Sequence, residues 1–264
     1  VLGDEPRRWR VFDEFGIGCR SGTRLGHRDL RGYQDPLLLK SYERVVASLR
    51  STPALAAQFN VRYALTGPHF LHGWNRHYLP PPDALQAEHG ATPRGDGVYV
   101  LDQALPFAYW VPDDQVERAP DRPAALARTA ALAPAPFAIV EGDGPSTVGT
   151  GSLPRAMETA GRLQWGRDRV RFRIHAGRAG QVVVNEVWYP GWQATVDGEP
   201  VPIHRANGLV RAVAVGPGQH EVEMIYRPPW GVALRCLWAL GWVLAVLLLC
   251  WRPMRRSLAE PHPH

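Results

Sequence analysis

A long apolar stretch near the C-terminus, residues 231–251, constrains this chain most. Its one charged residue is Arg235, and it ends against three arginines, Arg252, Arg255 and Arg256. A helix rises about 1.5 Å per residue, so about twenty residues cover the hydrocarbon core of a bilayer, which is about 30 Å thick. We therefore expect one transmembrane helix at residues 230–251. A buried core helix is the alternative, although soluble cores seldom contain apolar runs of this length.

The distribution of arginines predicts how this helix is oriented. Three arginines follow the stretch, whereas Arg227 and Arg235 lie near its start, and positive charge favours the cytoplasmic side. We expect residues 252–264 to form a cytoplasmic tail and residues 1–229 to be extracytoplasmic. The first residues contain neither a Met nor an apolar export signal. This arrangement therefore implies a longer protein, whose earlier membrane helices would deliver the outer part across the bilayer.

The composition allows a sizeable folded core and argues against nucleic-acid binding. The chain has 264 residues, 45% of them hydrophobic, and a net charge of +5. Because basic residues are mixed with acidic ones and form no block with interleaved aromatic residues, we expect no nucleic-acid partner. Cys236 and Cys250 lie in the apolar stretch, so Cys19 has no disulfide partner in the outer part.

The first region, residues 1–141, has the pattern of an α/β (α+β) fold. Strands are indicated at 9–13, 60–65, 98–101, 107–111 and 137–140, and helices at 35–50, 53–58 and 124–132. The first helix begins at Asp35-Pro36, a favoured N-cap followed by proline. Residues 67–97 are rich in Pro, Gly and His and predict a long surface excursion. Residues 142–164 have the composition of a linker or boundary.

The second region, residues 165–229, has the pattern of an all-β sandwich-like domain. Val170, Phe172 and Ile174 alternate with arginines, which is the period of a strand buried on one face. Asp197-Gly198 predicts a hairpin turn between two short strands. The fold class is therefore an α/β extracytoplasmic region, an all-β sandwich-like domain and one C-terminal transmembrane helix.

Short motifs in the second region resemble the C-terminal signature of the YfhO family of bacterial membrane proteins. They are Tyr189-Pro190-Gly191-Trp192, Val196-Asp197-Gly198, Arg205-Ala206-Asn207-Gly208, Pro217-Gly218 with His220, and Tyr226-Arg227-Pro228. Upstream, Gly32-Tyr33-Gln34-Asp35-Pro36 with Tyr42, Phe59-Asn60-Val61-Arg62-Tyr63, and Ala104-Leu105-Pro106 before Tyr109 resemble stretches of the same family's outer domain. The resemblance touches most of the chain, densely from Gln181 onward.

This resemblance implies a multi-pass protein of the bacterial inner membrane, related to the GT-C glycosyltransferases. Such proteins move sugars from polyprenyl-phosphate carriers onto acceptors outside the membrane, so the implied partners are the membrane, a polyprenyl-phosphate-linked sugar and an envelope glycan. The catalytic acid of that architecture belongs to an early outer loop, which this chain does not contain. We therefore expect no catalytic residue and no cofactor here. The alternative is a membrane-anchored glycan-binding or scaffold module without catalytic activity.

Trp188, Tyr189 and Trp192 are the candidate binding residues of the chain. Three aromatic side chains within five positions could stack on sugar rings, whose apolar faces suit flat aromatic partners. Packing of Trp192 into the core of the sandwich, behind a Pro190-Gly191 turn, is the alternative interpretation. The sequence alone does not distinguish exposed rings from buried ones.

Metal and acid–base chemistry have weaker candidates. His69, His72 and His77 could bind zinc through their imidazole nitrogens, but their spacing is not a recognised one and no Cys or carboxylate accompanies them. We therefore expect no metal site. The adjacent pairs Asp113-Asp114 and Asp13-Glu14 are expected to be solvated charges, since neighbours on a strand point to opposite faces.

Overall fold

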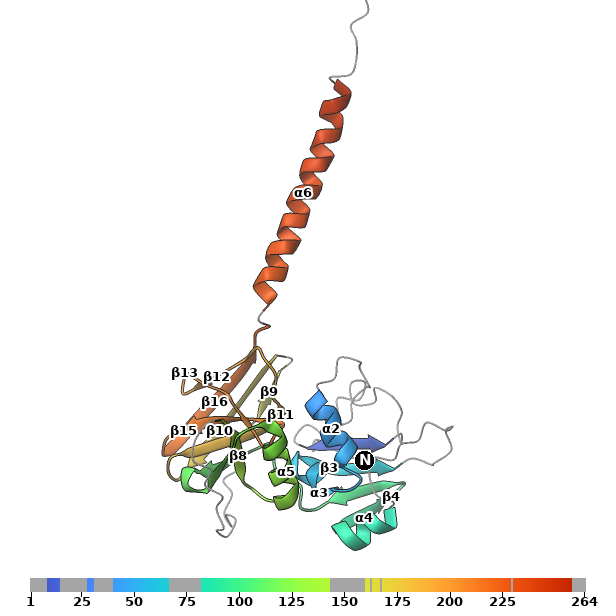
Figure 1. Ribbon diagram of the computed structural model, residues 1–264, viewed down its shortest axis with the longest axis vertical. Helices are drawn as coiled ribbons and strands as arrows, with labels where there is room; N and C mark the ends of the chain where they lie inside the picture. The colour runs from blue at the N-terminus through green and yellow to red at the C-terminus, as the bar shows by residue number, and fades with distance from the viewer. Residues whose placement is uncertain are drawn as a thin grey trace, which may run out of the picture.

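A computed structural model describes residues 9–14, 28–30, 40–66, 82–142, 160–161, 163–166, 168–228 and 230–257. Figure 1 shows a mixed α/β layer, a pair of β-sheets beside it, and one long helix that leaves the body of the protein. The β-rich character of the predicted fold class is confirmed, and the described residues form few helices. The final helix requires a correction, given below.

The α/β region is built on a five-stranded sheet with the order β2-β1-β3-β5-β4. Its strands are β1 (Arg10–Glu14), β2 (Arg28–Asp29), β3 (Val61–Thr66), β4 (Ala91–Gly95) and β5 (Val98–Leu101). β1 pairs in parallel with β2 and β3, whereas β3, β5 and β4 pair antiparallel. Helices α2 (Lys40–Ser48) and α3 (Ala54–Gln58) contribute Val45 and Leu55 to the main core, and Leu49 joins them directly after α2. The predicted 35–50 helix is thus confirmed from Lys40, while residues 31–39 lie outside the described part.

The surface excursion predicted for residues 67–97 is wrong in its second half. Helix α4 (Pro82–His89) and β4 occupy it, and Leu85 and Ala91 are buried in the main core. Gly95, Asp96 and Gly97 all have positive φ, which makes the tight turn that returns the chain from β4 into β5. Glycine composition therefore marked a hairpin rather than an irregular loop. Residues 67–81, which carry the three candidate zinc histidines, lie outside the described residues.

The sandwich consists of two sheets whose inner faces share one core. One sheet has the order β13-β12-β16-β10-β9, and the other β6-β11-β15-β14-β8-β7. The first comprises β9 (Gln164–Trp165), β10 (Arg169–Ala176), β12 (Trp192–Val196), β13 (Glu199–Val201) and β16 (Gly218–Tyr226). The second comprises β6 (Ala108–Pro112), β7 (Val116–Ala119), β8 (Ala138–Glu141), β11 (Gly180–Val187), β14 (His204–Ala206) and β15 (Val210–Val215).

Residues from both sheets form the core of the sandwich. Phe172 and Ile174 of β10 pack with Val182 of β11 and Val213 of β15 in one buried cluster. In β10 every second residue is buried, which confirms the predicted one-sided strand. The predicted hairpin at Asp197-Gly198 is also confirmed, because both residues have positive φ between β12 and β13.

Three strands of the six-stranded sheet precede residue 142. β6 pairs with β11, and β8 pairs with β14, while β7 adds in parallel beside β8. Helix α5 (Arg122–Leu132) connects β7 to β8 and begins at Asp121, whose side chain accepts a 2.8 Å hydrogen bond from the Ala124 amide. The sheet thus takes strands from both sides of the predicted 142–164 linker, of which residues 143–159 lie outside the described residues.

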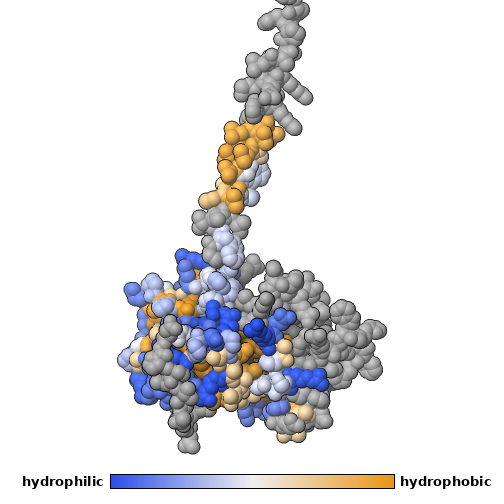
Figure 2. All heavy atoms as spheres, in the orientation of Figure 1, coloured by the Kyte–Doolittle hydropathy of each residue, from blue (hydrophilic) through white to orange (hydrophobic). Residues whose placement is uncertain are grey.

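The last helix, α6 (Gly231–Ser257), is where the predicted transmembrane span is corrected. Among the described residues, no helix combines the length and the apolar character needed to cross a membrane, so the span predicted at 230–251 is not supported. Arg235 interrupts the apolar stretch and Arg252 ends it, which leaves an uninterrupted run shorter than the about 20 residues of a usual span. Large apolar side chains from Leu237 to Leu249 are nevertheless exposed along α6 (Figure 2).

Candidate functional site

The structure separates Trp188 from the other two candidate binding residues. Trp188 lies beneath Arg205, whose guanidinium carbon is 3.8 Å from the centroid of the indole ring. Arg205 in turn donates to Glu141 at 2.8 Å, an ion pair at the far end of β8. Among the described residues no ring contact joins Trp188 to Tyr189 or Trp192. Trp188 therefore stacks on a different side chain from those that Tyr189 and Trp192 contact.

Tyr189 and Trp192 instead form an aromatic cluster with Tyr226. Ring centroids are 6.2 Å apart for Tyr189 and Trp192, 5.2 Å for Tyr189 and Tyr226, and 5.5 Å for Trp192 and Tyr226. All three side chains are partly buried. Distances in this range are those at which aromatic rings stabilise one another. We call Tyr189, Trp192 and Tyr226 the aromatic cluster.

Strand register brings the aromatic cluster together. Trp192 at the start of β12 lies opposite Tyr226 at the end of β16, and the next inward pair, Ala194 and Met224, is fully buried. The cluster therefore closes the open end of the sandwich core. Sequence reasoning did not connect Tyr226 with Trp192. One side of Trp192 packs against the core, as the alternative interpretation expected, while part of its ring surface stays accessible.

The chain enters α6 directly from this end of the sandwich. The Arg227 amide donates a 2.7 Å hydrogen bond to the carbonyl of Gly191, and α6 begins a few residues later. Gly191 has a positive φ, which lets the chain turn between Tyr189 and Trp192. Figure 1 shows α6 rising from the end of β16. The aromatic cluster accordingly lies at the base of α6.

A buried arginine lies against the inner side of the cluster. The guanidinium carbon of Arg211 is 3.7 Å from the Trp192 ring centroid, and Arg211 is only 2% exposed. Arg211 belongs to β15, where Val213 and Val215 continue its face into the core. An arginine thus occupies a position where the alternation predicts an apolar residue. This break in the alternation was the available signal, and sequence reasoning missed it.

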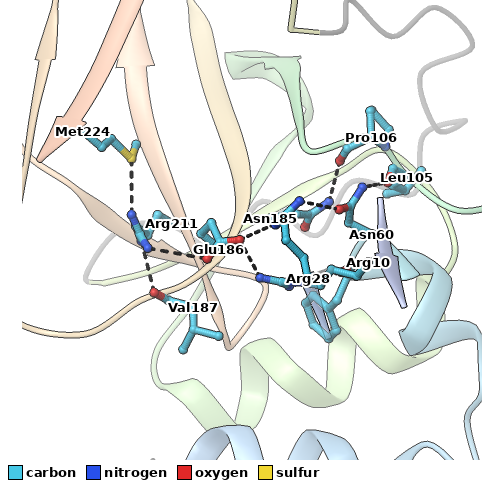
Figure 3. A network of polar contacts seen from close by, with 11 residues as sticks. Arg10, Arg28, Asn60, Leu105, Pro106, Asn185, Glu186, Val187, Arg211 and Met224 are labelled. Carbon is cyan, nitrogen blue, oxygen red and sulfur yellow. Dashed lines mark hydrogen bonds and ion pairs between the residues drawn. The ribbon is translucent and has the colours of Figure 1, made fainter. Parts of the chain in front are cut away.

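Arg211 is one of three arginines around Glu186 (Figure 3). Arg10 donates to the Glu186 carboxylate at 2.7 Å, Arg28 donates to the same oxygen, and the second oxygen is 3.9 Å from Arg211. Arg10 and Arg28 come from β1 and β2 of the α/β region, whereas Glu186 and Arg211 belong to the sandwich. We call these four residues the seam cluster, because they join the two regions.

Burial and charge act in opposite directions within the seam cluster. Burial by itself would raise the pKa of Glu186, but the charges of Arg10, Arg28 and Arg211 outweigh it and lower that pKa to about 2. Burial lowers the pKa of Arg28 and of Arg211 to about 10, and Glu186 opposes this shift in both. Glu186 is therefore ionised, and Arg28 and Arg211 stay protonated, at neutral pH.

Asparagine side chains complete the seam next to this cluster. The Asn60 amide group donates at 2.9 Å to the Leu105 carbonyl, and Asn185 donates at 2.8 Å to the Pro106 carbonyl. Arg28 also donates at 3.1 Å to the side-chain oxygen of Asn60 (Figure 3). Backbone groups that strand pairing leaves unused are satisfied in this way, so the segment before β6 is fixed between the regions.

The candidate acid–base pairs do not converge on a substrate site. Asp114 follows β6 on the surface, where it forms an exposed ion pair with Arg178 at 2.8 Å, and Asp113 is exposed beside it. Exposed pairs of this kind are solvated and contribute little. Asp13 is buried on β1, so the prediction of a solvated charge is wrong for this residue. The aromatic cluster and the arginine behind it are thus the best candidate for a functional site within the described residues.

These observations define a β-sandwich region with an aromatic cluster at the base of a long, apolar C-terminal helix. Residues 161–235 match the family model of the bacterial membrane protein YfhO. The C-terminal part of the chain is therefore similar to the YfhO family, as the sequence resemblance predicted, and the matched residues include the whole aromatic cluster, Glu186 and Arg211. This match to a family of bacterial membrane proteins supports association with a membrane. No curated protein matches the chain.

Proposed function

We propose that this chain is the outer region of a YfhO-family membrane protein that transfers lipid-linked sugars, and that its aromatic cluster contacts the glycan. The observation that carries the proposal is the position of the cluster inside the family match and at the base of α6. In this proposal residues 1–229 lie outside the cytoplasmic membrane. The donor is a polyprenyl-phosphate-linked sugar, and the groups that catalyse transfer belong to a membrane core elsewhere in the protein.

The chemistry of the cluster supports contact with a sugar. Aromatic side chains provide flat apolar faces with polar edges, and sugar rings present matching apolar faces and hydroxyl groups. Tyr189 and Tyr226 add phenolic hydroxyls beside the indole of Trp192. Because the three rings pack against one another, little conformational freedom is lost when a ligand binds.

The exposed surface of α6 supports a location next to the membrane. Leu237, Trp238 and Trp242 are more than half exposed, and apolar residues continue along the helix to Leu249. An apolar surface of this extent on a folded protein marks contact with a membrane or another protein. In the proposal these side chains contact the membrane part of the parent protein or the surrounding lipid, which brings the aromatic cluster close to lipid-linked sugars.

Glycan binding by the purified chain tests the proposal directly. We expect Trp192→Ala to weaken binding of an oligosaccharide about tenfold, which corresponds to about 1.4 kcal/mol for a lost stacking contact. Chitohexaose, maltohexaose and a mannohexaose serve as probes in calorimetric titration. Trp188→Ala is the matched control, because it removes an indole of the same size that stacks on a different arginine. Equal binding by wild type and Trp192→Ala would contradict the proposed contact.

Transfer is tested in the full-length protein in its own membrane. We expect Trp192→Ala to lower envelope glycosylation while the protein remains folded and membrane-associated. If the full-length protein binds glycan but its deletion leaves glycosylation unchanged, the chain belongs to a glycan-binding or scaffold module instead.

A further inference from the structure

Trp192 lacks the hydrogen bond that usually fixes a buried indole. Its Nε1 atom is buried and has no hydrogen-bond partner among the described residues. Among the described residues, the ring contacts Tyr189, Tyr226 and the guanidinium of Arg211, and it also packs against the apolar core of the sandwich. Of these three, Arg211 is the one that is itself fully buried.

Arg211 is held in turn by contacts at all three nitrogens of its guanidinium group. Its Nε donates at 3.1 Å to the Val187 carbonyl, and its Nη1 lies 3.8 Å from the sulfur of Met224. The carboxylate of Glu186 lies 3.9 Å from Nη2 (Figure 3). Because Arg211 comes from β15 and Trp192 from β12, this side chain crosses between the two sheets at the open end of the sandwich.

Stability alone gives little reason for an arginine at this place. Replacing a buried ion pair with apolar residues of similar volume is often neutral or stabilising, so a buried arginine is weak evidence for added stability. What a guanidinium provides and a methionine does not is a flat, cationic surface that stacks on an indole face. The position of this arginine behind a candidate ligand-binding ring therefore points to a role in orienting that ring.

We propose that Arg211 is a positioning residue, which fixes the ring of Trp192 for contact with the glycan and is itself held by Glu186. This inference rests on the proposed function for its ligand, but the orientation of the ring can be measured without one. Trp188 with Arg205 provides a matched pair elsewhere in the same chain, since the stacking distance is 3.8 Å there and 3.7 Å at Trp192.

The test compares Arg211→Lys with Arg205→Lys in the purified full chain. Lysine keeps the positive charge but loses the planar group that stacks, so a loss of function would report on geometry rather than charge. With tryptophan replaced by 5-fluorotryptophan, each indole gives a separate fluorine resonance, and Trp192→Phe and Trp188→Phe assign the two of interest. Arg211→Lys should shift and broaden the Trp192 resonance and leave that of Trp188 unchanged, whereas Arg205→Lys should do the reverse.

Affinity for the oligosaccharide that wild type binds is the second readout. Arg211→Lys should weaken binding about fivefold to tenfold, and Arg205→Lys less than twofold, at temperatures where both variants are folded. A wild-type Trp192 resonance in Arg211→Lys, or equal losses of affinity in the two variants, would overturn the positioning role. If the Trp192 resonance changes as expected but wild type binds no saccharide, the positioning role stands and the proposed glycan contact fails.

Discussion

Two groups of arginine–glutamate ion pairs in the molecule differ sharply in burial, one on the surface of a sheet and one at the seam cluster. On the outer face of the β10–β16 pair, Arg169, Arg171 and Arg173 alternate along one strand and pair with Glu221 and Glu223 on the other. The arginine side chains there are 46–76% exposed. At the seam cluster, Glu186 is surrounded by arginines that are at most 12% exposed. The same two residue types thus form a solvated surface in one place and a buried junction in the other.

The difference in burial indicates which ion pairs stabilise the fold. When an exposed ion pair forms, the two charges give up contacts with water, so each pair contributes only about 0–1 kcal/mol to the free energy of unfolding. A buried carboxylate whose partners are also buried cannot exchange them for water, so removing it leaves the remaining charges unpaired. We therefore expect the joint between the α/β region and the sandwich to depend on Glu186 far more than the sheet depends on its surface pairs.

Removing the buried carboxylate should have the largest effect. We expect Glu186→Gln to lower the free energy of unfolding by about 3–5 kcal/mol, because it leaves three buried guanidinium groups without their anion. Chemical denaturation followed by circular dichroism measures the change. A loss of under about 1 kcal/mol would show that the seam cluster behaves like a surface pair.

Acid should weaken the same junction through the pKa of Glu186. The folded pKa of about 2 lies below the ordinary value of 4.5, so this carboxylate stabilises the fold fully above about pH 4.5. The stabilisation, on the order of 3 kcal/mol, should be lost as pH falls from about 4.5 towards 2. Denaturation at a series of pH values measures it, and Glu186→Gln is the control, since its stability should fall less over this range.

Removing an exposed partner should have the smallest effect. We expect Glu223→Gln, which loses a 3.3 Å pair with Arg169, to cost less than about 1 kcal/mol. In about 1 M salt this cost should vanish because exposed charges are screened, whereas the cost of Glu186→Gln should persist. A salt-independent loss at Glu223 would remove the distinction between the two settings.

The two settings also differ in how far they could be predicted from the sequence. The surface pairs follow from alternation, since Val170, Phe172 and Ile174 must face the core and the intervening arginines must face water. Local rules of this kind also placed the Asp197-Gly198 hairpin and the helices near residues 40–58. The seam cluster does not follow from them, because Arg10 and Glu186 lie 176 positions apart and meet only when two regions pack.

The candidate site lies between these cases. Trp188, Tyr189 and Trp192 are close in sequence but do not share the same contacts. Trp188, directly after β11, stacks on Arg205, whereas Trp192, after the turn at Gly191, packs against Tyr226. Residue type predicted an aromatic cluster, and only strand register could supply its third member. The sequence shows that Arg211 is a charged residue among apolar ones. It does not show that Arg211 contacts Trp192, which belongs to another sheet.

The pairing of β6 with β11 has a consequence for how the chain reaches its fold during synthesis. All strands of the α/β sheet have been synthesised once Leu101 has been added, so that sheet can assemble early. The six-stranded sheet must wait until Val215, because β15 lies between β11 and β14. Until β11 has been made, β6 has no partner strand, and a chain truncated before β11 would leave the buried residues of β6 exposed. Cleavage at residues 143–159 would therefore yield two fragments that complement each other, rather than two units that fold independently.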